Sequence, residues 1–181
     1  GARAARVNSP PRGAGRDAAL PRGSPGDTSG TKSLRREWVM TASAPLVTIF
    51  GGSGFVGRYV AQAMAQRGWR VRVAVRRPAE AHFVRPYGEV GQVEPVQANL
   101  RDDASVRAAV RGATAVINCV GLLVETGPQT FRAVQAEGAA RAARLAREEG
   151  VERFVQISAI GADPESPAAY ARTKAEAEAA I

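Results

Sequence analysis

Hydrophobic positions follow two different spacings along most of this chain. Short runs of β-branched and other apolar residues alternate with longer stretches in which apolar residues recur every three or four positions. The runs are typical of strands buried in a sheet, and the three-to-four spacing is typical of helices that pack one face against it. The predicted strands cover residues 46–50, 70–75, 93–97, 113–120 and 153–157.

Helical stripes lie between most of these strands. They cover residues 56–64, 102–112, 131–145 and 166–181, whereas residues 82–90, which contain a proline and a glycine, are predicted to form a loop. Strands separated by helices favour parallel pairing through right-handed crossovers. The predicted fold is therefore α/β, a doubly wound parallel-sheet Rossmann fold. Because the pattern ends in a helix with no closing strand, residues 45–181 are expected to be an incomplete domain.

Three glycines spaced three apart follow the first strand. Gly51 would allow a tight turn, Gly54 would let a phosphate approach the backbone, and Gly57 would let the next helix pack closely. A pyrophosphate would accept hydrogen bonds from free N–H groups at the helix N-terminus. The alternative is a tight strand–helix turn without a ligand. The other predicted cofactor contacts in this segment are Ser53, Phe55 and Val56.

Two arginines follow the second predicted strand, where NAD-binding Rossmann units usually carry an acid. A carboxylate at this position would repel a 2′-phosphate, whereas the guanidinium groups of Arg76 and Arg77 could bind it in bidentate fashion. The first acid after them is Glu80. The sequence therefore favours NADP(H) over NAD(H), which remains the alternative. A solvated arginine pair at a strand end would look the same.

Polar and small residues also follow the third and fourth predicted strands. Asn99, with Leu100 beside it, is placed to contact an adenine, although a capping role fits Asn99 equally well. Asn118, Val120 and Gly121 lie where a cofactor would cross the strand ends, and Gly121 would allow close approach. A simple strand-ending turn is the alternative there.

A candidate catalytic group lies in the last part of the chain. Tyr170 and Lys174 are four residues apart and would share one helix face, so the ammonium would favour the phenolate. Lys174 could also bond the nicotinamide ribose. Ser158 ends the fifth predicted strand and could polarise a substrate carbonyl beside the tyrosine. A partly exposed tyrosine with a solvated lysine is the alternative.

Composition narrows the remaining choices. The net charge is +8, of which residues 1–40 contribute +5, so the predicted domain is only mildly basic. Aromatic residues make up 6% of the chain, and nucleic-acid binding is not predicted. Residues 1–44, rich in Ala, Arg, Gly and Pro, are expected to be disordered. They could lie upstream of a true start at Met40, and an organelle transit peptide is the alternative.

The only cysteine and the only histidine of the chain limit its possible disulfide and metal chemistry. Cys119 is the only cysteine, which excludes an internal disulfide and suits a reducing compartment; in its apolar run it is expected to be a small core residue. His82 is the only histidine and has no partners for a metal, so no metal site is predicted. No apolar stretch approaches the roughly 20 residues of a membrane span, and peripheral membrane association stays open.

Together these residues resemble the short-chain dehydrogenase/reductase (SDR) superfamily in its extended or atypical branch, over residues 46–181. The runs 51–60, 76–78, 96–101, 116–121 and 158–163 look most like the family of SDR-type accessory subunits of respiratory complex I and their alphaproteobacterial relatives. That resemblance implies bound NADP(H), complex I subunits as partners, a structural or assembly role and little turnover. It also implies the bacterial cytoplasm or the cytoplasmic face of the inner membrane, with the mitochondrial matrix as the alternative.

The chain departs from the superfamily in two places. Gln135 stands where many extended members carry an asparagine, which puts their usual water or proton path in doubt, and the C-terminal substrate lobe is missing. Three hypotheses follow from these observations. The first is a nucleotide-bearing structural subunit. The second is a free NADP-dependent oxidoreductase, or a nucleotide-sugar epimerase or dehydratase, that uses Ser158, Tyr170 and Lys174. The third, a redox-sensing NADP binder without catalysis, is disfavoured by the intact Tyr/Lys pair.

Overall fold

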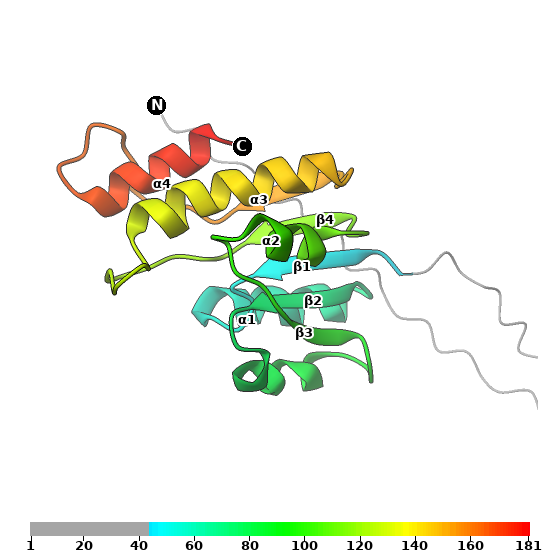
Figure 1. The fold of residues 1–181 in the computed structure, drawn as a ribbon. Helices are drawn as coiled ribbons and strands as arrows, with labels where there is room; N and C mark the ends of the chain where they lie inside the picture. Colours follow the sequence, from blue (N-terminus) through cyan, green and yellow to red (C-terminus); the bar gives the residue numbers. More distant parts are fainter. Residues whose placement is uncertain (1–43) are drawn as a thin grey trace, which may run out of the picture. The chain divides into compact units, whose positions relative to one another are not determined.

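A parallel five-stranded sheet forms the centre of the computed structural model, which describes residues 44–181 (Figure 1). The expectation of a disordered tail over residues 1–44, and of a start at Met40, falls outside the described residues apart from residue 44. The strands follow the order β3-β2-β1-β4-β5, and every neighbouring pair is parallel. Their bounds are β1 Leu46–Phe50, β2 Arg70–Val75, β3 Val93–Gln97, β4 Ala115–Asn118 and β5 Arg153–Gln156.

The strand order reverses direction at β1, because β2 and β3 lie on one side of it and β4 and β5 on the other. At such a switch point the loops after the two central strands diverge and leave a crevice at their carboxyl ends. The predicted doubly wound α/β Rossmann fold is therefore confirmed. The helices that connect the strands are α1 Phe55–Gln66, α2 Asp103–Val110, α3 Glu137–Glu148 and α4 Ala169–Ala179.

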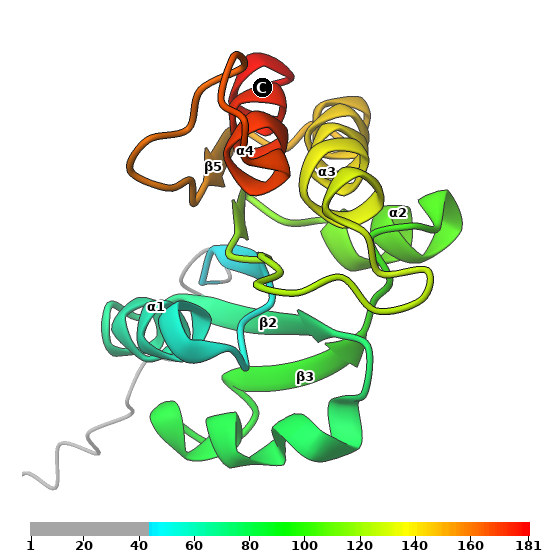
Figure 2. The same cartoon turned by 90° about the vertical axis from the view of Figure 1, so that its left-hand side faces the viewer.

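Helices cover both faces of the sheet (Figure 2). Because side chains alternate along a strand, Val47 and Ile49 pack with Ala61 of α1, whereas Phe50 packs with Val106 of α2 and Leu145 of α3. Thr48 points to the α2 side, where its buried hydroxyl donates to the Ala109 carbonyl at 2.8 Å. The two faces thus have separate apolar cores. None of the helices in the described part of the chain is long and apolar enough to cross a membrane.

Two predicted element boundaries are wrong. The expected loop over residues 82–90 lies largely within a 3₁₀ helix, η1 Pro78–Tyr87. Proline suits its first turn, and the buried Ala81 and Val84 are three residues apart, the period of a 3₁₀ helix. The last helix begins at Ala169 and not near residue 166, because the Ser166 hydroxyl accepts a hydrogen bond from the Ala168 N–H and closes a turn there.

The long helix expected from residue 131 has an irregular start. Its first part is a π-helical turn, η2 Arg132–Ala136, and regular α-helix begins only with α3. The predicted strand 113–120 is likewise shorter, because it ends at Asn118, whose side chain accepts from the Val120 N–H at 3.1 Å and turns the chain. Apolar spacing marked both segments but could not show a widened turn or a side-chain cap.

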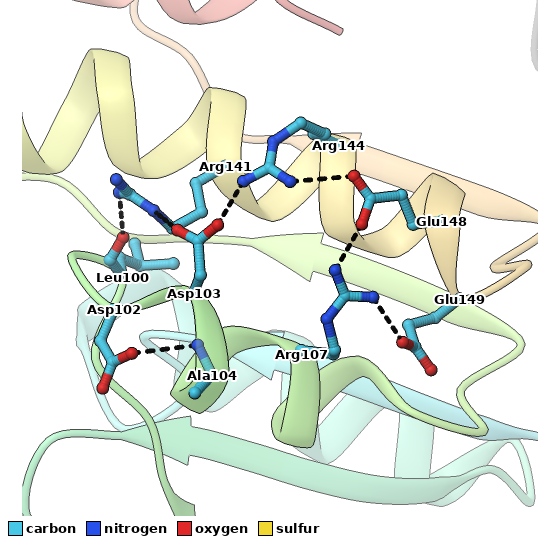
Figure 3. A network of polar contacts seen from close by, with 9 residues as sticks. All are labelled: Leu100, Asp102, Asp103, Ala104, Arg107, Arg141, Arg144, Glu148 and Glu149. Atoms are coloured by element: carbon cyan, nitrogen blue, oxygen red, sulfur yellow. Dashed lines mark hydrogen bonds and ion pairs between the residues drawn. The ribbon is translucent and has the colours of Figure 1, made fainter.

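An ionic network joins α2 to α3 (Figure 3). The Asp103 carboxylate accepts from Arg141 and Arg144, and Arg107 donates to Glu148 and Glu149. Acidic residues open α2, where the Asp102 carboxylate caps the Ala104 N–H at 3.0 Å. Arg141 reaches further, because its Nη1 donates to the Leu100 carbonyl at 2.8 Å.

Candidate nucleotide-binding site

The turn between β1 and α1 has the backbone geometry that its glycines permit. Gly51 has a φ of +70°, which disfavours other residues. A methyl group on Gly51 would also lie 3.0 Å from Val120 Cγ2. At Gly57 a methyl group would lie 2.8 Å from Gly52 Cα and would clash with the Gly51 carbonyl oxygen. The close approach of helix to turn therefore depends on Gly57.

The start of α1 leaves backbone donors available beside this turn. Gly54 is the N-cap, with no side-chain cap, and the first helical turn has no acidic residue. The N–H groups of a first turn have no acceptor within their helix and carry a partial positive charge. Phe55 and Val56, the first two residues of α1, are 80% and 44% exposed, so the helix begins at the surface of the protein.

A cavity of about 430 Å³ lies over the carboxyl ends of the strands, a volume typical of small-molecule sites. Of the predicted cofactor-binding residues, Phe55, Val56, Gly57 and Asn118 do not line it, and neither do Ser158, Tyr170 and Lys174. The structure brings the remaining nine together in its wall: Gly51, Ser53, Gly54, Arg76, Arg77, Asn99, Leu100, Val120 and Gly121.

The arginines after β2 differ in their surroundings. Arg77 Nη1 pairs with the Glu80 carboxylate at 3.1 Å, and both side chains are exposed, so this pair contributes little stability. Arg76 has no ion pair with any residue in the range 44–181. Its guanidinium is therefore the freer of the two to meet an anionic ligand. Phe83, also in the cavity wall, lies under the Arg58 guanidinium at 5.3 Å from its ring centroid.

Asn99 and Asn118 shape the chain at the ends of two strands. The Asn99 side chain accepts from the Arg101 N–H at 3.1 Å, which is the capping alternative. Asn118 is buried and donates to the Gln156 side chain at 2.8 Å, while its oxygen accepts from Val120. Asn118 thus holds the backbone that presents Val120 to the cavity from behind the wall.

Arg101 is a cavity residue that the sequence analysis did not select. Its Nε is buried and has no hydrogen-bond partner among the described residues, while its Nη1 reaches the Pro128 carbonyl at 3.4 Å. A buried charged donor without a partner is costly, and Arg101 is one of the residues that line the cavity. The available signal was a basic residue two positions after Asn99, at the carboxyl end of a parallel strand.

Cys119 packs against the apolar core on the α1 face, but it lies at the edge of that core and not inside it as the sequence predicted. It is half-buried and lines the cavity, because β4 ends one residue earlier and the backbone turns outward there. Burial raises the pKa of the Cys119 thiol to about 11, although the nearby Lys174 ammonium opposes that rise. The thiol is therefore protonated at neutral pH and is a weak nucleophile.

Tyr170 and Lys174 lie in α4, as predicted, whereas Ser158 lies two residues after the end of β5 and not at its last position. The hydroxyl of Ser158 is buried and has no partner among the described residues. Lys174 is only 3% exposed, its Nζ donates to the Ile157 carbonyl at 3.2 Å, and burial lowers its pKa, against the opposing charges of Cys119 and Glu178. The same Nζ lies 6.0 Å from the centroid of the Tyr170 ring.

Gly121 connects this group to the cavity. A methyl group on Gly121 would lie 3.5 Å from Lys174 Nζ and 3.5 Å from Gln135 Oε1. Gly121 itself lines the cavity, so the cavity wall and the Tyr/Lys helix meet at this residue. The arrangement offers the backbone N–H groups at the start of α1 and the guanidinium groups of Arg76 and Arg77 at one side. At the other side it offers the hydroxyl of Ser158, the phenol of Tyr170 and the ammonium of Lys174.

Known proteins match this chain over most of the described residues. The profile of the NAD(P)H-binding family matches residues 51–181. NADH dehydrogenase [ubiquinone] 1 alpha subcomplex subunit 9 of Arabidopsis thaliana is 35% identical over 78% of the chain and 36% of its own length. Ceramide reductase of Caulobacter vibrioides is 35% identical over 78% of the chain and 43% of its length. The chain thus spans well under half of either relative.

A solved structure supports the same assignment. The putative NAD-dependent epimerase/dehydratase of Bacillus halodurans superposes with a TM-score of 0.66 at 25% identity, covering 76% of this chain and 64% of the other. Sequence and fold therefore agree on the resemblance expected from the motifs. The chain belongs to the NAD(P)H-binding Rossmann family and is homologous to complex I alpha subcomplex subunit 9 and to SDR-type epimerases and reductases.

Proposed function

We propose that this chain is the NADP(H)-binding part of an accessory or assembly subunit of respiratory complex I. The observation that carries the proposal is the cavity, in which a tight glycine turn and two arginines meet at the carboxyl ends of β1 and β2. Relatives named as complex I subunits are 31–35% identical to the chain. They support complex I subunits as its partners.

The residues present fit a dinucleotide. Gly51 and Gly57 keep side chains out of the turn, and the free donors at the start of α1 suit a pyrophosphate. Arg101 adds a third guanidinium group to the wall of the cavity. Ser53, Gly54, Asn99, Leu100, Val120 and Gly121 complete the proposed cofactor-binding wall, with Phe55 and Val56 contributing backbone N–H groups.

NADP(H) is the preferred form of the cofactor in this proposal. Arg76 has no acidic partner in the described part of the chain, and the one acid nearby, Glu80, is already paired with Arg77. A guanidinium free of a carboxylate favours a ligand with a 2′-phosphate over one with a 2′-hydroxyl. Bound NADP(H) would supply hydride chemistry in an enzyme, and would act as a structural element in a subunit without turnover.

A second candidate is a free NADP-dependent reductase or an epimerase-type enzyme. It is favoured by the hydroxyl of Ser158, which has no partner among the described residues, by the proximity of Lys174 to Tyr170, and by the similarity to a ceramide reductase. In that case Tyr170 would act as the acid, Lys174 would assist it, and Ser158 would orient a carbonyl. In the structural-subunit proposal, Tyr170 and Lys174 only hold the nicotinamide ribose.

One experiment separates the two candidates. The tagged full-length gene product is followed on native gels of solubilised membranes that are stained for NADH dehydrogenase activity. Comigration with complex I supports the accessory-subunit proposal. It also agrees with the proposed peripheral location at the inner membrane, on the cytoplasmic side in a bacterium or the matrix side in a mitochondrion. Migration as a small soluble species contradicts it and supports a free reductase. Purified protein titrated with NADPH and NADH then tests the cofactor preference.

A further inference from the structure

Exposed apolar side chains gather at the surface around the start of α1. Phe55, Val56 and Tyr59 are all exposed, Tyr59 to 59%, and their spacing places them on one side of the helix. Ala61 and Ala65, which pack on the sheet, lie on the other side. The described part of the chain therefore buries one side of α1 and leaves a second apolar side at the surface.

Phe83 of η1 extends this surface beside α1. The two helices share one apolar core, to which Ala61 and Val84 belong. Phe83 is 45% exposed, and its ring lies under the guanidinium of Arg58 at 5.3 Å from the ring centroid. Single exposed apolar residues are common on proteins, whereas several together mark an interaction site. The aromatic patch is defined here as Phe55, Val56, Tyr59 and Phe83.

The rings of the aromatic patch have fixed orientations before any partner binds. Phe55 and Tyr59 pack edge-to-face, with centroids 6.0 Å apart and ring planes at 87°. The contact with Arg58 holds Phe83 in the same way. Ordering exposed side chains is one of the entropy costs of forming an interface, and these rings have lost much of that freedom already.

The charge beside the aromatic patch is positive. Arg58 has no ion pair with any residue in the range 44–181, and it donates only to neutral carbonyls, those of Gly54 at 3.2 Å and Ser53 at 3.4 Å. α1 contains no acidic residue, and the one acid of η1, Glu80, is paired with Arg77. Carboxylates on a partner would therefore complement the charge of Arg58.

Two classes of partner use exposed rings beside a guanidinium group. Single-stranded nucleic acid stacks successive bases on aromatic faces, but the rings of Phe55 and Tyr59 are perpendicular to each other and Arg58 covers one face of Phe83. The centres of protein interfaces, by contrast, are enriched in aromatic residues and arginine whatever the angles between the rings. The geometry of the aromatic patch favours a protein.

We propose that the aromatic patch is the docking face of this chain for a protein partner that presents apolar side chains flanked by carboxylates. The inference rests on the proposed function, under which the partner is a complex I subunit. Tyr59 is the anchor, because its ring is exposed, is held by Phe55 and takes no part in the proposed nucleotide site. Arg58 meets the carboxylates of the partner.

The test follows full-length variants in cells that lack the native gene. Solubilised membranes are run on native gels, and the share of tagged protein that comigrates with complex I is measured after membrane washes of increasing salt. Tyr59→Ser should lower that share about tenfold, as expected for one truncated interface anchor, and Tyr59→Phe should keep it within about twofold of wild type. Val90→Ser makes a matched change at a fully exposed residue between η1 and β3 and should behave like wild type.

The charge of Arg58 is tested separately. Arg58→Ala should weaken comigration and make it less sensitive to salt, and Arg58→Glu should weaken it further, because it would repel the carboxylates of the partner. A benzophenone side chain placed at position 59 should crosslink to a complex I subunit under light, and the same group at position 90 should not. Purified Tyr59→Ser should bind NADPH like wild type, since the nucleotide site is untouched.

Several results would overturn the inference. Comigration of Tyr59→Ser at the wild-type level would remove the docking role while leaving the proposed function intact. A variant Arg58→Glu no weaker than Arg58→Ala would show that the partner is not acidic, and a crosslinked product that nuclease removes would show nucleic acid in place of protein. If Tyr59→Ser does not fold or loses NADPH, the crosslink at position 59 decides alone. A wild-type protein that does not comigrate with complex I would overturn the proposed function itself and this inference with it.

Discussion

Replacing Gly57 by alanine tests the packing of α1 on the phosphate turn. In most helix positions this change is stabilising, by up to about 1 kcal/mol. Here the new methyl group would lie 2.8 Å from Gly52 Cα and would clash with the Gly51 carbonyl oxygen. Both contacts are to backbone that the sheet holds in place, so helix and turn must separate, and overpacking of this kind costs roughly 1–3 kcal/mol.

Because both contacts are with backbone, the cost should lie in the upper part of that range, roughly 2–3 kcal/mol. After the helical gain of about 1 kcal/mol, the expected net effect of Gly57→Ala is a loss of roughly 1–2 kcal/mol in the free energy of unfolding. Urea denaturation followed by circular dichroism measures it, and NADPH affinity should fall as the turn opens. Gly138→Ala is the matched control, since Gly138 is also a helical glycine and its new methyl group would meet the Leu100 side chain at 3.1 Å. The atom it would meet is Leu100 Cβ, and this milder contact is relieved by a much smaller shift than the one Gly57 requires, so Gly138→Ala should be clearly less destabilising than Gly57→Ala. The reasoning is refuted if Gly57→Ala is as stable as wild type, or if the two variants are equally destabilised.

Three further predictions concern charges. Arg76→Ala should weaken NADPH binding by roughly 1.5–3 kcal/mol, the range for a hydrogen bond to a charged group, and NADH much less; isothermal titration that shows equal losses would remove the NADP assignment. The ion pairs with Arg144 and Arg107 lower the pKa values of Asp103 and Glu148. The contribution of these ion pairs to stability is thus present above the unfolded pKa near 4 and is lost as the pH falls through the lower folded pKa values. In the double variant Asp103→Asn, Glu148→Gln, the free energy of unfolding should therefore fall less steeply with decreasing pH than in wild type. An unchanged acid profile would contradict this. Because the Cys119 thiol has a pKa of about 11, its alkylation by iodoacetamide should be slow at pH 8 and rise until about pH 11, and a plateau near pH 9 would show an ordinary exposed thiol.

The alternation of apolar runs and stripes was sufficient to predict the strands and the fold. Each of the five predicted strands overlaps an observed one, since runs such as 46–50 and 70–75 have few ways to be buried other than in a parallel sheet. The glycine turn was equally accessible, because only glycine tolerates the φ of Gly51 and the contact at Gly57. These features depend on residues that are close together in the sequence.

The features that the sequence did not predict depend on distant partners. Arg101 stands out only when the Pro128 carbonyl and the cavity are in place, and Gln135 only when Leu122 and Thr173 reach it from two other segments. Periodicity also cannot separate a π-helical turn from an α-helical one over five residues. The incomplete burial of Cys119 was missed for a related reason, because its apolar run continues past the point where Asn118 ends the strand.

Arg141 belongs at once to the surface network of α2 and α3 and, through the Leu100 carbonyl, to the wall of the cavity (Figure 3). Dissolved salt competes for the exposed carboxylate of Asp103 at one end of this guanidinium. Leu100 at its other end is a buried wall residue that ions in solution do not reach. Ligand affinity should consequently depend on ionic strength even for an uncharged adenosine analogue, and by reciprocity a bound nucleotide should make the α2–α3 pairing less sensitive to electrolyte.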